Sequence, residues 1–518
     1  MTAAADPTSS PWRARARPGI GAGIGAGIAV GILTTGLLSQ ASPVWVFLVA
    51  AAIVGALPTF LVRDPEAYWF GVFVLSMMVE VQKAFGDGLD VMARYGFQIE
   101  TAPSVSQLLP ELRLSDLPLL VLLALWAWKV AHHRKPLVFP RVAWIAVAYF
   151  AWAGLSAIMA PHPYLGAVEW IRHFKFFVVF LWAVNNVDRR ALLNVAAAGA
   201  IVVLTLQAGL TITRYSLGFT FLTGNAFGRQ DAVDSTEHLR IDQGGGGSRR
   251  RAFGTVSSPR GTAGHLLLLL PWAALGAARL RDRRARTVLL AALGVGAAAL
   301  LLTYSRAGLV GSLVGALVGL GVLFRWGVVS RRGVVAVVFA GVLAGLLAGP
   351  LAHHFLTSRQ DNLKVRGAQY RAAINMVRAH PLFGVGLNNH TLVQRNYSTW
   401  ATSVPLDDPE KSSFLHPIHS QHFASLVEVG FVGLGLWLGF FIALGRRAWR
   451  ALEVPDALLA VTLGASLVGG VALFTQMLAD PIHEAAVLGL LWLQGGLVWV
   501  AAEAARRRPP ALAADAET

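Results

Sequence analysis

The turn Thr303-Tyr-Ser-Arg-Ala-Gly308 carries Arg306 between two apolar segments that are each long enough to cross a bilayer. A guanidinium in so short a turn stays close to the membrane surface, where it must reach toward water, pair with an acid or bind a ligand. Arginine forms bidentate contacts with phosphate oxygens, which lysine does not form. Arg306 therefore predicts a bound anion at the membrane boundary, and a diphosphate or polyphosphate is the best match.

A second group of polar side chains lies in the segment Val365–Arg378, which has the pattern of an amphipathic helix. Ala373 and Met376 fall on one apolar face, three residues apart. Arg366 and Tyr370 are four residues apart and are therefore neighbours on the surface of that helix. We expect this helix to lie outside the membrane, on the end of a membrane-spanning bundle.

The predicted helix is followed by the glycine-rich turn Pro381-Leu-Phe-Gly-Val-Gly-Leu387. Gly384 and Gly386 permit a tight turn that approaches a neighbouring group closely, because glycine has no Cβ. Both are predicted to lie beside a bound substrate.

Histidines and one carboxylate follow at the end of the same connection. His416, His419 and His422 precede the next apolar segment, and Glu428 lies inside it, nine residues after His419. A histidine near the membrane boundary can act as a general base, although His419 is equally consistent with a polar residue at a helix start. A carboxylate at the depth of Glu428 is costly, so it is either functional or neutralised by a neighbouring helix. Three histidines in seven residues could also bind zinc, but they lack a carboxylate at fixed ligand spacing, and we predict no metal.

Further arginines occupy the connections on the side that we predict to be external. Because long loops cross the membrane regardless of charge, solvated side chains are the simpler interpretation of each such arginine alone. Together, so many arginines on the external side depart from the usual enrichment of Arg and Lys on the cytoplasmic side, and this departure supports an anion site. They are Arg249, Arg250, Arg251, Arg260, Arg359, Arg366, Arg371, Arg378 and Arg395.

The composition is that of a membrane protein. Of 518 residues, 55% are hydrophobic and 14% are charged, whereas a soluble chain is about 25% charged. The absence of cysteine excludes disulfides, thiolate metal sites, iron–sulfur clusters and a cysteine nucleophile. The net charge of +16 lies mainly in predicted cytoplasmic loops, so it does not indicate a nucleic-acid partner.

Apolar segments recur along the whole chain and predict about fourteen transmembrane helices. They lie near residues 19–39, 43–62, 66–81, 116–131, 142–160, 169–186, 191–212, 263–280, 287–303, 308–324, 333–351, 421–444, 456–477 and 484–502. Every second connection is rich in arginine and lysine, which predicts that both termini are cytoplasmic. Ser39-Gln40-Ala41 resembles the cleavage site of a signal peptide. The apolar stretch before it is longer than the usual hydrophobic region of such a peptide, so we expect an uncleaved first helix. The long connections 82–115, 213–262 and 352–420 then lie on the external side.

Three short patterns resemble the superfamily of O-antigen ligases and O-antigen polymerases, which are bacterial membrane glycosyltransferases. The first is the Tyr-Ser-Arg-Ala-Gly turn at 304–308. The second is Arg366 followed by Tyr370-Arg-Ala-Ala-Ile and by His380-Pro-Leu-Phe-Gly-Val-Gly386, although tryptophan is common in the family where Tyr370 stands. The third is His419-Ser420, a gap of nine residues, and Gly430-Phe-Val-Gly433.

This resemblance implies an all-α, GT-C-like polytopic bundle with a long helical periplasmic loop before the third-last helix. It divides the chain into N-terminal helices (1–250), a ligase-like catalytic region (251–445) that includes loop 352–420, and C-terminal helices with a basic tail (446–518). The implied activity is metal-independent, inverting transfer of a glycan from undecaprenyl diphosphate, in the bacterial inner membrane and without a cofactor. The implied acceptor is lipid A-core or another glycan.

The resemblance also implies roles for single residues. Arg306 and Arg366 would stabilise the leaving diphosphate, with Arg371 and Arg260 as further anion ligands. His419 would accept the proton of the acceptor hydroxyl or orient that hydroxyl; alternatively, Glu428 is the base and His419 only binds. Tyr370, Gly384 and Gly386 would contact the substrate.

Other activities are consistent with parts of the pattern. A ligase and a polymerase share the carrier and the chemistry, so these patterns do not separate them, and a third member of the class would transfer glycan to a protein. A transporter or flippase is disfavoured, because the polar groups lie in outer loops and at helix ends rather than at mid-membrane.

Overall fold

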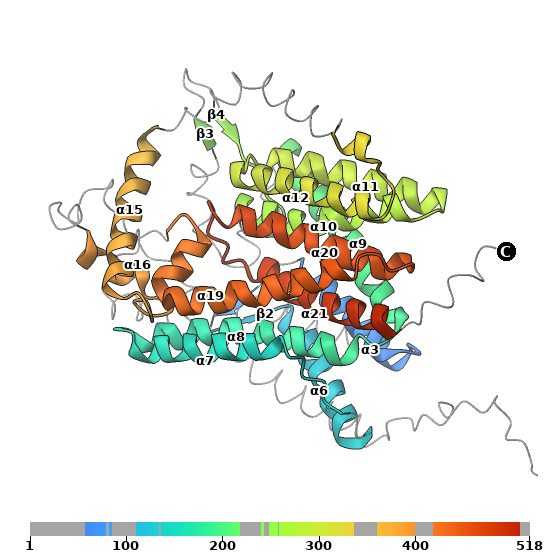
Figure 1. The fold of residues 1–518 in the computed structure, drawn as a ribbon, viewed down its shortest axis with the longest axis horizontal. Helices are drawn as coiled ribbons and strands as arrows, with labels where there is room; N and C mark the ends of the chain where they lie inside the picture. The colour runs from blue at the N-terminus through green and yellow to red at the C-terminus, as the bar shows by residue number, and fades with distance from the viewer. Residues whose placement is uncertain are drawn as a thin grey trace, which may run out of the picture.

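The computed structural model is a bundle of long helices with a smaller helical layer at one end (Figure 1). It describes residues 57–78, 82–84, 110–133, 136–217, 240–242, 248–256, 258–335, 360–398 and 418–507. Within these ranges, the regular structure is helical apart from two short strand pairs.

Seven of the described helices are long and apolar enough to cross a membrane, since about 20 residues span the ~30 Å hydrocarbon layer. They are α9 (Arg190–Leu217), α10 (Pro259–Arg279), α11 (Arg283–Leu302), α12 (Arg306–Arg325), α19 (Gln421–Arg450), α20 (Ala457–Gln476) and α21 (Ala485–Arg507). Each coincides with a predicted span. The chain is therefore an all-α, multi-pass membrane protein.

Four further helices correspond to predicted spans. They are α3 (Pro65–Ser76), α6 (Asp116–His133), α7 (Ala143–Met159) and α8 (Pro163–Asn186). Helix α8 begins about two turns before the predicted start at residue 169, with Pro163 at its first position, where proline is favoured because no backbone N–H is needed there. The predicted spans 19–39, 43–62 and 333–351 lie wholly or largely outside the described residues.

The centre of the bundle consists of α10, α20 and α21. Helix α10 packs against α11 and α20, and α21 packs against α8. The most apolar 18-residue windows of α10 and α21 are 83% and 89% buried, against 28% for α11 and α12, so the last two are peripheral helices that face lipid. Aromatic rings fill the contact between α8, α19 and α21, where Phe440 stacks on Trp492 and meets Phe180 edge-on.

One end of the bundle carries the arginines that were predicted to be cytoplasmic, and many of them are paired with acids. Arg189 binds Glu66 at 2.9 Å, and Arg325 binds Glu453 at 2.6 Å. Arg447 binds Glu503 at 2.7 Å. Intramolecular ion pairs therefore offset part of the positive charge at this end.

Besides the helices of the bundle, the described residues form two short strand pairs, and a group of three further helices lies at the opposite end of the bundle. Strands β1 (Gln82–Ala84) and β2 (Glu111–Arg113) pair antiparallel, as do β3 (Arg240–Asp242) and β4 (Ser248–Arg250). The helices α15 (Gln360–Ala379) and α16 (His390–Val393) and the 3-10 helix η5 (Gln394–Tyr397) lie beside the start of α19 (Figure 1). Ala373 and Met376 are fully buried in a small apolar cluster with Val427, which confirms the predicted amphipathic helix.

Candidate active site

Helix α19 is broken at Gly430, where φ is 68° and ψ is −176°. The sequence pattern predicted one continuous helix, and that prediction was wrong at this residue. The break leaves backbone groups without helical partners, and the glycine-rich turn satisfies them. The three hydrogen bonds run from Val385 N to Val427 O (2.9 Å), from Gly386 N to Glu428 O (3.1 Å) and from Phe431 N to Pro381 O (2.9 Å).

Glycine is required on both sides of this contact. Gly430, Gly384 and Gly386 all have positive φ, a region that side chains disfavour. A Cβ on Gly430 would lie 2.0 Å from Leu382 O, and one on Gly384 would lie 2.3 Å from the carbonyl carbon of Glu428. Gly384 and Gly386, predicted to lie beside the substrate, thus pack directly against the protein backbone.

Helix α7 supports the same contact from the side. Ser156 Oγ lies 2.8 Å from Phe383 O and 2.9 Å from Glu428 O, so it can donate to either chain segment. Trp152 donates to Val429 O at 3.1 Å and stacks on Phe383 with ring centroids 4.3 Å apart. The turn and the broken helix are therefore held as one unit.

Glu428 is hydrogen-bonded to His390, the first residue of α16. Nδ1 of His390 lies 2.5 Å from Oε1 of Glu428, and the two side chains are only 5% and 13% exposed. The preceding Asn389 fixes the start of α16, because its side chain accepts from His162 N at 3.0 Å and donates to Leu387 O at 2.8 Å. The sequence predicted that Glu428 is either functional or paired. In the structure it is paired, and its partner is an ionisable histidine.

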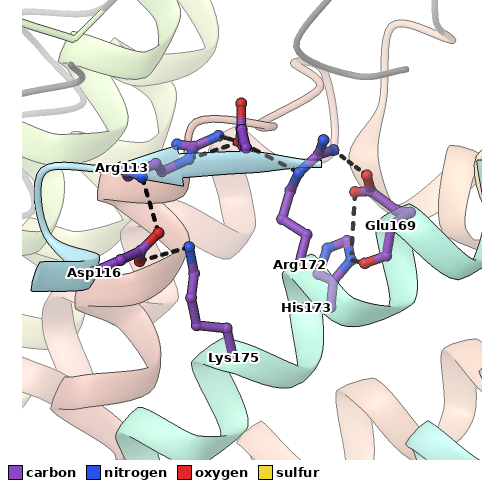
Figure 2. Close-up of polar contacts among 7 residues, drawn as sticks. Arg113, Asp116, Glu169, Arg172, His173 and Lys175 are labelled. Carbon is purple, nitrogen blue, oxygen red and sulfur yellow. Dashed lines mark hydrogen bonds and ion pairs between the residues drawn. The ribbon is translucent and has the colours of Figure 1, made fainter. Parts of the chain in front are cut away.

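A second carboxylate–histidine pair lies near the start of α8. Glu169 binds Arg172 and lies 3.3 Å from Nδ1 of His173. Arg172 continues to Glu111 on β2, which also accepts from Nε of Arg113 at 2.7 Å. These side chains form one connected group, as Figure 2 shows.

The group ends in a further ion pair across α6 and α8. Asp116 accepts from Arg113 N at 2.9 Å and binds Lys175 at 2.8 Å (Figure 2). Together with Glu111, Glu169 and Arg172, the network holds as many carboxylates as permanent cations. Its charges therefore compensate one another, which explains how α8 carries them inside the bundle.

His483, in the connection from α20 to α21, interacts electrostatically with residues of both carboxylate–histidine pairs. Burial lowers the pKa of His483 to about 4, Glu169 acts in the opposite direction, and His390, Arg260 and His173 lower it further. His483 is therefore neutral near pH 7. The same interactions place it within electrostatic reach of residues from α8, α10 and α16.

The connection from α20 to α21 also joins the starts of three helices. Gln476 donates to Arg260 O at 3.0 Å, at the start of α10. Asp480 accepts from Ser305, the N-cap of α12, at 3.3 Å. The start of α19 is joined through Gln421, whose backbone donates to Met477 O at 2.9 Å. The starts of α10, α12 and α19 thus meet at one end of the bundle.

The four predicted anion ligands lie at this end of the molecule. Arg260 and Arg306 are in the first turns of α10 and α12, and both are partly buried. Arg371 is an exposed residue of α15. Arg366 is also in α15, but its side chain lies outside the described residues.

Tyr370 and His419 are adjacent in the structure. The hydroxyl of Tyr370 donates to His419 O at 2.9 Å, and its ring stacks on Phe423 with centroids 5.5 Å apart. Tyr370 therefore connects α15 to the start of α19, and His419 lies directly before that helix.

The histidine cluster considered for zinc is not assembled in the described part of the chain. Nε2 of His422 lies 2.9 Å from Phe474 O, toward α20, and His416 lies outside the described residues. Among the described residues, no three His, Asp or Glu side chains are grouped as metal ligands.

The sequence patterns did not identify His390, Glu169, His173 or His483 as site residues. The signal for the α8 residues was present, because Glu169, Arg172, His173 and Lys175 are four ionisable residues within seven positions of a predicted span. No comparable signal marked His390 or His483, since each is a single histidine in a connection.

Residues 289–438 match the family model described as O-antigen ligase. The match covers most of α11 and all of α12, α15 and α16, and it ends after the break in α19. It therefore includes Arg306, Arg366, His390, His419 and Glu428. No curated protein matches the chain.

Proposed function

We propose that this chain, whose residues 289–438 match the O-antigen ligase family model, is a member of the O-antigen ligase and polymerase superfamily that transfers a glycan from undecaprenyl diphosphate to an acceptor. We assign it to the ligase type, with lipid A-core as the acceptor. The alternative within the superfamily is a polymerase, whose acceptor is another carrier-linked glycan. The observation that carries the proposal is the meeting, at one end of the bundle, of the helix starts that bear Arg260, Arg306 and His419.

The proposed topology has this end of the bundle in the periplasm, with both termini in the cytoplasm. The charge pattern supports it, because Arg189, Arg325 and Arg447 all lie at the other end. The proposed membrane is the bacterial inner membrane. In the proposed division of the chain, the catalytic region is 251–445, with helices before and after it completing the bundle.

Arginines supply the proposed donor site. The diphosphate gains negative charge as it leaves, and a guanidinium already in place stabilises that charge without reorganisation. Arg260 and Arg306 each lie in the first turn of a helix, where the backbone N–H groups add partial positive charge. Arg366 and Arg371 on α15 would act from the outer side, and we propose that the reaction needs no metal.

The proposed reaction inverts the anomeric centre by direct attack. The acceptor oxygen bonds to the anomeric carbon on the side opposite the diphosphate, and a base removes the acceptor proton. The base proposed from the sequence is His419 or Glu428, with the other residue binding the acceptor. Tyr370 supports this end of the site by fixing the backbone of His419.

Deleting the gene and analysing the surface glycans tests the assignment. Loss of a ligase should leave long chains on the carrier and bare lipid A-core. Loss of a polymerase should instead leave single repeats attached to lipid A-core, and unchanged surface glycans would contradict both activities. Complementation with the wild-type gene is the control.

A further inference from the structure

His390 has the bonding pattern of a histidine that accepts a proton. Its Nδ1 lies 2.5 Å from Oε1 of Glu428. An ionised carboxylate can only accept a hydrogen bond, so Nδ1 carries the proton of that bond. In the neutral imidazole, Nε2 then bears the free lone pair. This is the arrangement in which a carboxylate holds a catalytic imidazole in one tautomer.

Nε2 of His390 is also buried without a hydrogen-bond partner in the described part of the chain. Nearly all buried polar atoms in proteins have such a partner, so an exception requires an explanation. The His390 side chain is 5% exposed, so the nitrogen is shielded from bulk water. A substrate hydroxyl that enters the site would supply the missing partner.

The imidazole is held in place from several directions. Asn389 ties the start of α16 to His162 and Leu387. The glycine turn that precedes α16 is hydrogen-bonded to the broken part of α19, directly beside Glu428. Glu428 and His390 therefore come from two segments that are fixed to each other, and such fixed geometry is what proton transfer requires.

The ionisable groups that interact with this pair come from several elements. Glu428 belongs to α19, and His483 comes from the connection of α20 to α21 and interacts electrostatically with His390. The same His483 interacts with Arg260 at the start of α10 and with Glu169 and His173 on α8. The His390–Glu428 pair and Arg260, a cation suited to a diphosphate, thus both lie within electrostatic reach of one histidine.

We propose that His390 is the general base of the transfer reaction and that Glu428 is the positioning residue that acts through it. This inference rests on the proposed function. As the acceptor oxygen bonds to the anomeric carbon, its proton moves to Nε2 of His390. The bond from that carbon to the diphosphate oxygen breaks, and its electron pair leaves with the diphosphate. The imidazolium is stabilised by Glu428 and returns its proton to water before the next turnover.

Under this assignment, His419 is not the base. Tyr370 holds the backbone of His419 at the start of α19, and under this assignment His419 binds or orients the acceptor while His390 takes the proton. The assignment also gives Glu428 a role, because a carboxylate bonded to an imidazole acts on the substrate through that imidazole.

The test measures glycan transfer by purified full-length variants between about pH 5 and pH 9. His390→Asn retains an amide that can bond Glu428 but removes Nε2. It should lower kcat by about 10²–10⁴-fold, the usual contribution of a general base, with little change in the KM for the donor. The acid-side fall of the wild-type rate should disappear. Glu428→Gln should lower kcat and not the KM for the donor, and His132→Asn, at an exposed histidine of α6, is the matched control.

The outcomes separate the base assignment from the proposed function. Wild-type protein that transfers no glycan from a polyprenyl diphosphate contradicts the proposed function itself, and the base assignment with it. An active wild type whose His390→Asn variant keeps the normal rate and acid-side fall overturns only the base assignment. The base assignment is also overturned if His419→Asn, and not His390→Asn, removes the acid-side fall. If His390→Asn is not recovered folded, His390→Gln, which also lacks the imidazole base, replaces it in the same comparison.

Discussion

Arg306 places a charge near the membrane boundary, which is energetically unfavourable, and its guanidinium can bind an anion. It lies in the first turn of α12, after the short turn that Ser305 caps. The capping serine is in turn bonded to Asp480, so the helix start that carries the arginine is fixed to the connection between α20 and α21. A guanidinium presented in this way suits a lipid-linked diphosphate better than a mobile loop arginine does.

Replacing Arg306 or Arg366 by alanine should reduce glycan transfer by about 10²–10³-fold, the usual loss when one fixed transition-state donor is removed. The measurement is product formation from a carrier-linked glycan by purified protein. Arg325→Ala is the matched control, because Arg325 is on the same helix as Arg306 but at the opposite end, paired with Glu453. Full activity in both Arg306→Ala and Arg366→Ala would exclude a diphosphate clamp made of these residues.

His483 should make the folded protein sensitive to acid. Its pKa is about 4 in the folded state, against about 6.5 for an unperturbed histidine. Because the folded state disfavours the protonated form, stability is highest above about pH 6.5 and falls as the pH drops toward 4.

Thermal unfolding of detergent-solubilised protein at pH 7, 6 and 5 measures this effect. His483→Gln, which does not titrate, should show a smaller drop between pH 7 and 5 than the wild type. His132→Asn should retain the wild-type drop, since that histidine is exposed. Equal slopes for the His483→Gln variant and the wild type would contradict burial of a neutral His483.

At the level of elements, the break in α19 determines where Glu428 and the glycine turn meet. The backbone of Gly430 has a conformation that is almost exclusive to glycine. The glycine turn donates hydrogen bonds to the carbonyls of Val427 and Glu428, and the amide of Phe431, after the break, donates to Pro381 O. The position of His390, a few residues after that turn, follows from this contact.

Gly430→Ala should therefore destabilise the protein by at least about 1–3 kcal/mol, the cost of a strained backbone conformation, with the contact of the new Cβ with Leu382 O added. The thermal midpoint in detergent and the transfer activity should both fall. Gly435→Ala is the control, because a Cβ at that position of the same helix meets no atom within 4 Å. Equal midpoints for the two variants would mean that the break is not needed for stability.

Helix α8 shows how a spanning segment can hold many charges. Glu169, Arg172 and Lys175 are compensated by one another and by the β2 segment and the start of α6 (Figure 2). Breaking one such buried pair leaves an uncompensated charge, which costs far more than the pair contributes. The network therefore fixes α6, β2 and α8 relative to one another beside the site.

At the scale of the whole molecule, the two ends of the bundle have different chemistry. One end holds arginines of helix ends and connections, many in ion pairs with acids. The other end gathers histidines, carboxylates and the arginines of helix starts around the connection between α20 and α21. Such asymmetry suits an enzyme that works at one membrane face on a lipid-anchored donor.

Chelation tests the proposed metal independence of that enzyme. Transfer by the purified protein should be unchanged by excess EDTA, because protein guanidinium groups supply the positive charge for the leaving diphosphate. Initial rates with EDTA, with EDTA followed by Mg²⁺, and with EDTA followed by Zn²⁺ measure this. Activity that is lost with EDTA and restored by either ion would contradict the proposal.

The sequence alone determined the class of the protein and the seven long spans. Those spans follow from local hydrophobicity, since about 20 apolar residues must form a helix to satisfy their backbone in lipid. The turn that carries Arg306, the amphipathic helix and the family patterns are likewise local, so they could be read from neighbouring residues. The match at 289–438 agrees with those patterns.

The tertiary structure decided which distant residues meet. His390 and Glu428 are 38 positions apart and are joined only because a glycine turn docks on a broken helix. His483 comes near His390, Glu169 and Arg260 through the packing of α8, α10 and α21, and its low pKa arises from burial in that packing. Spacing along the chain contains no information on such contacts, because they depend on how helices pack and where one of them breaks.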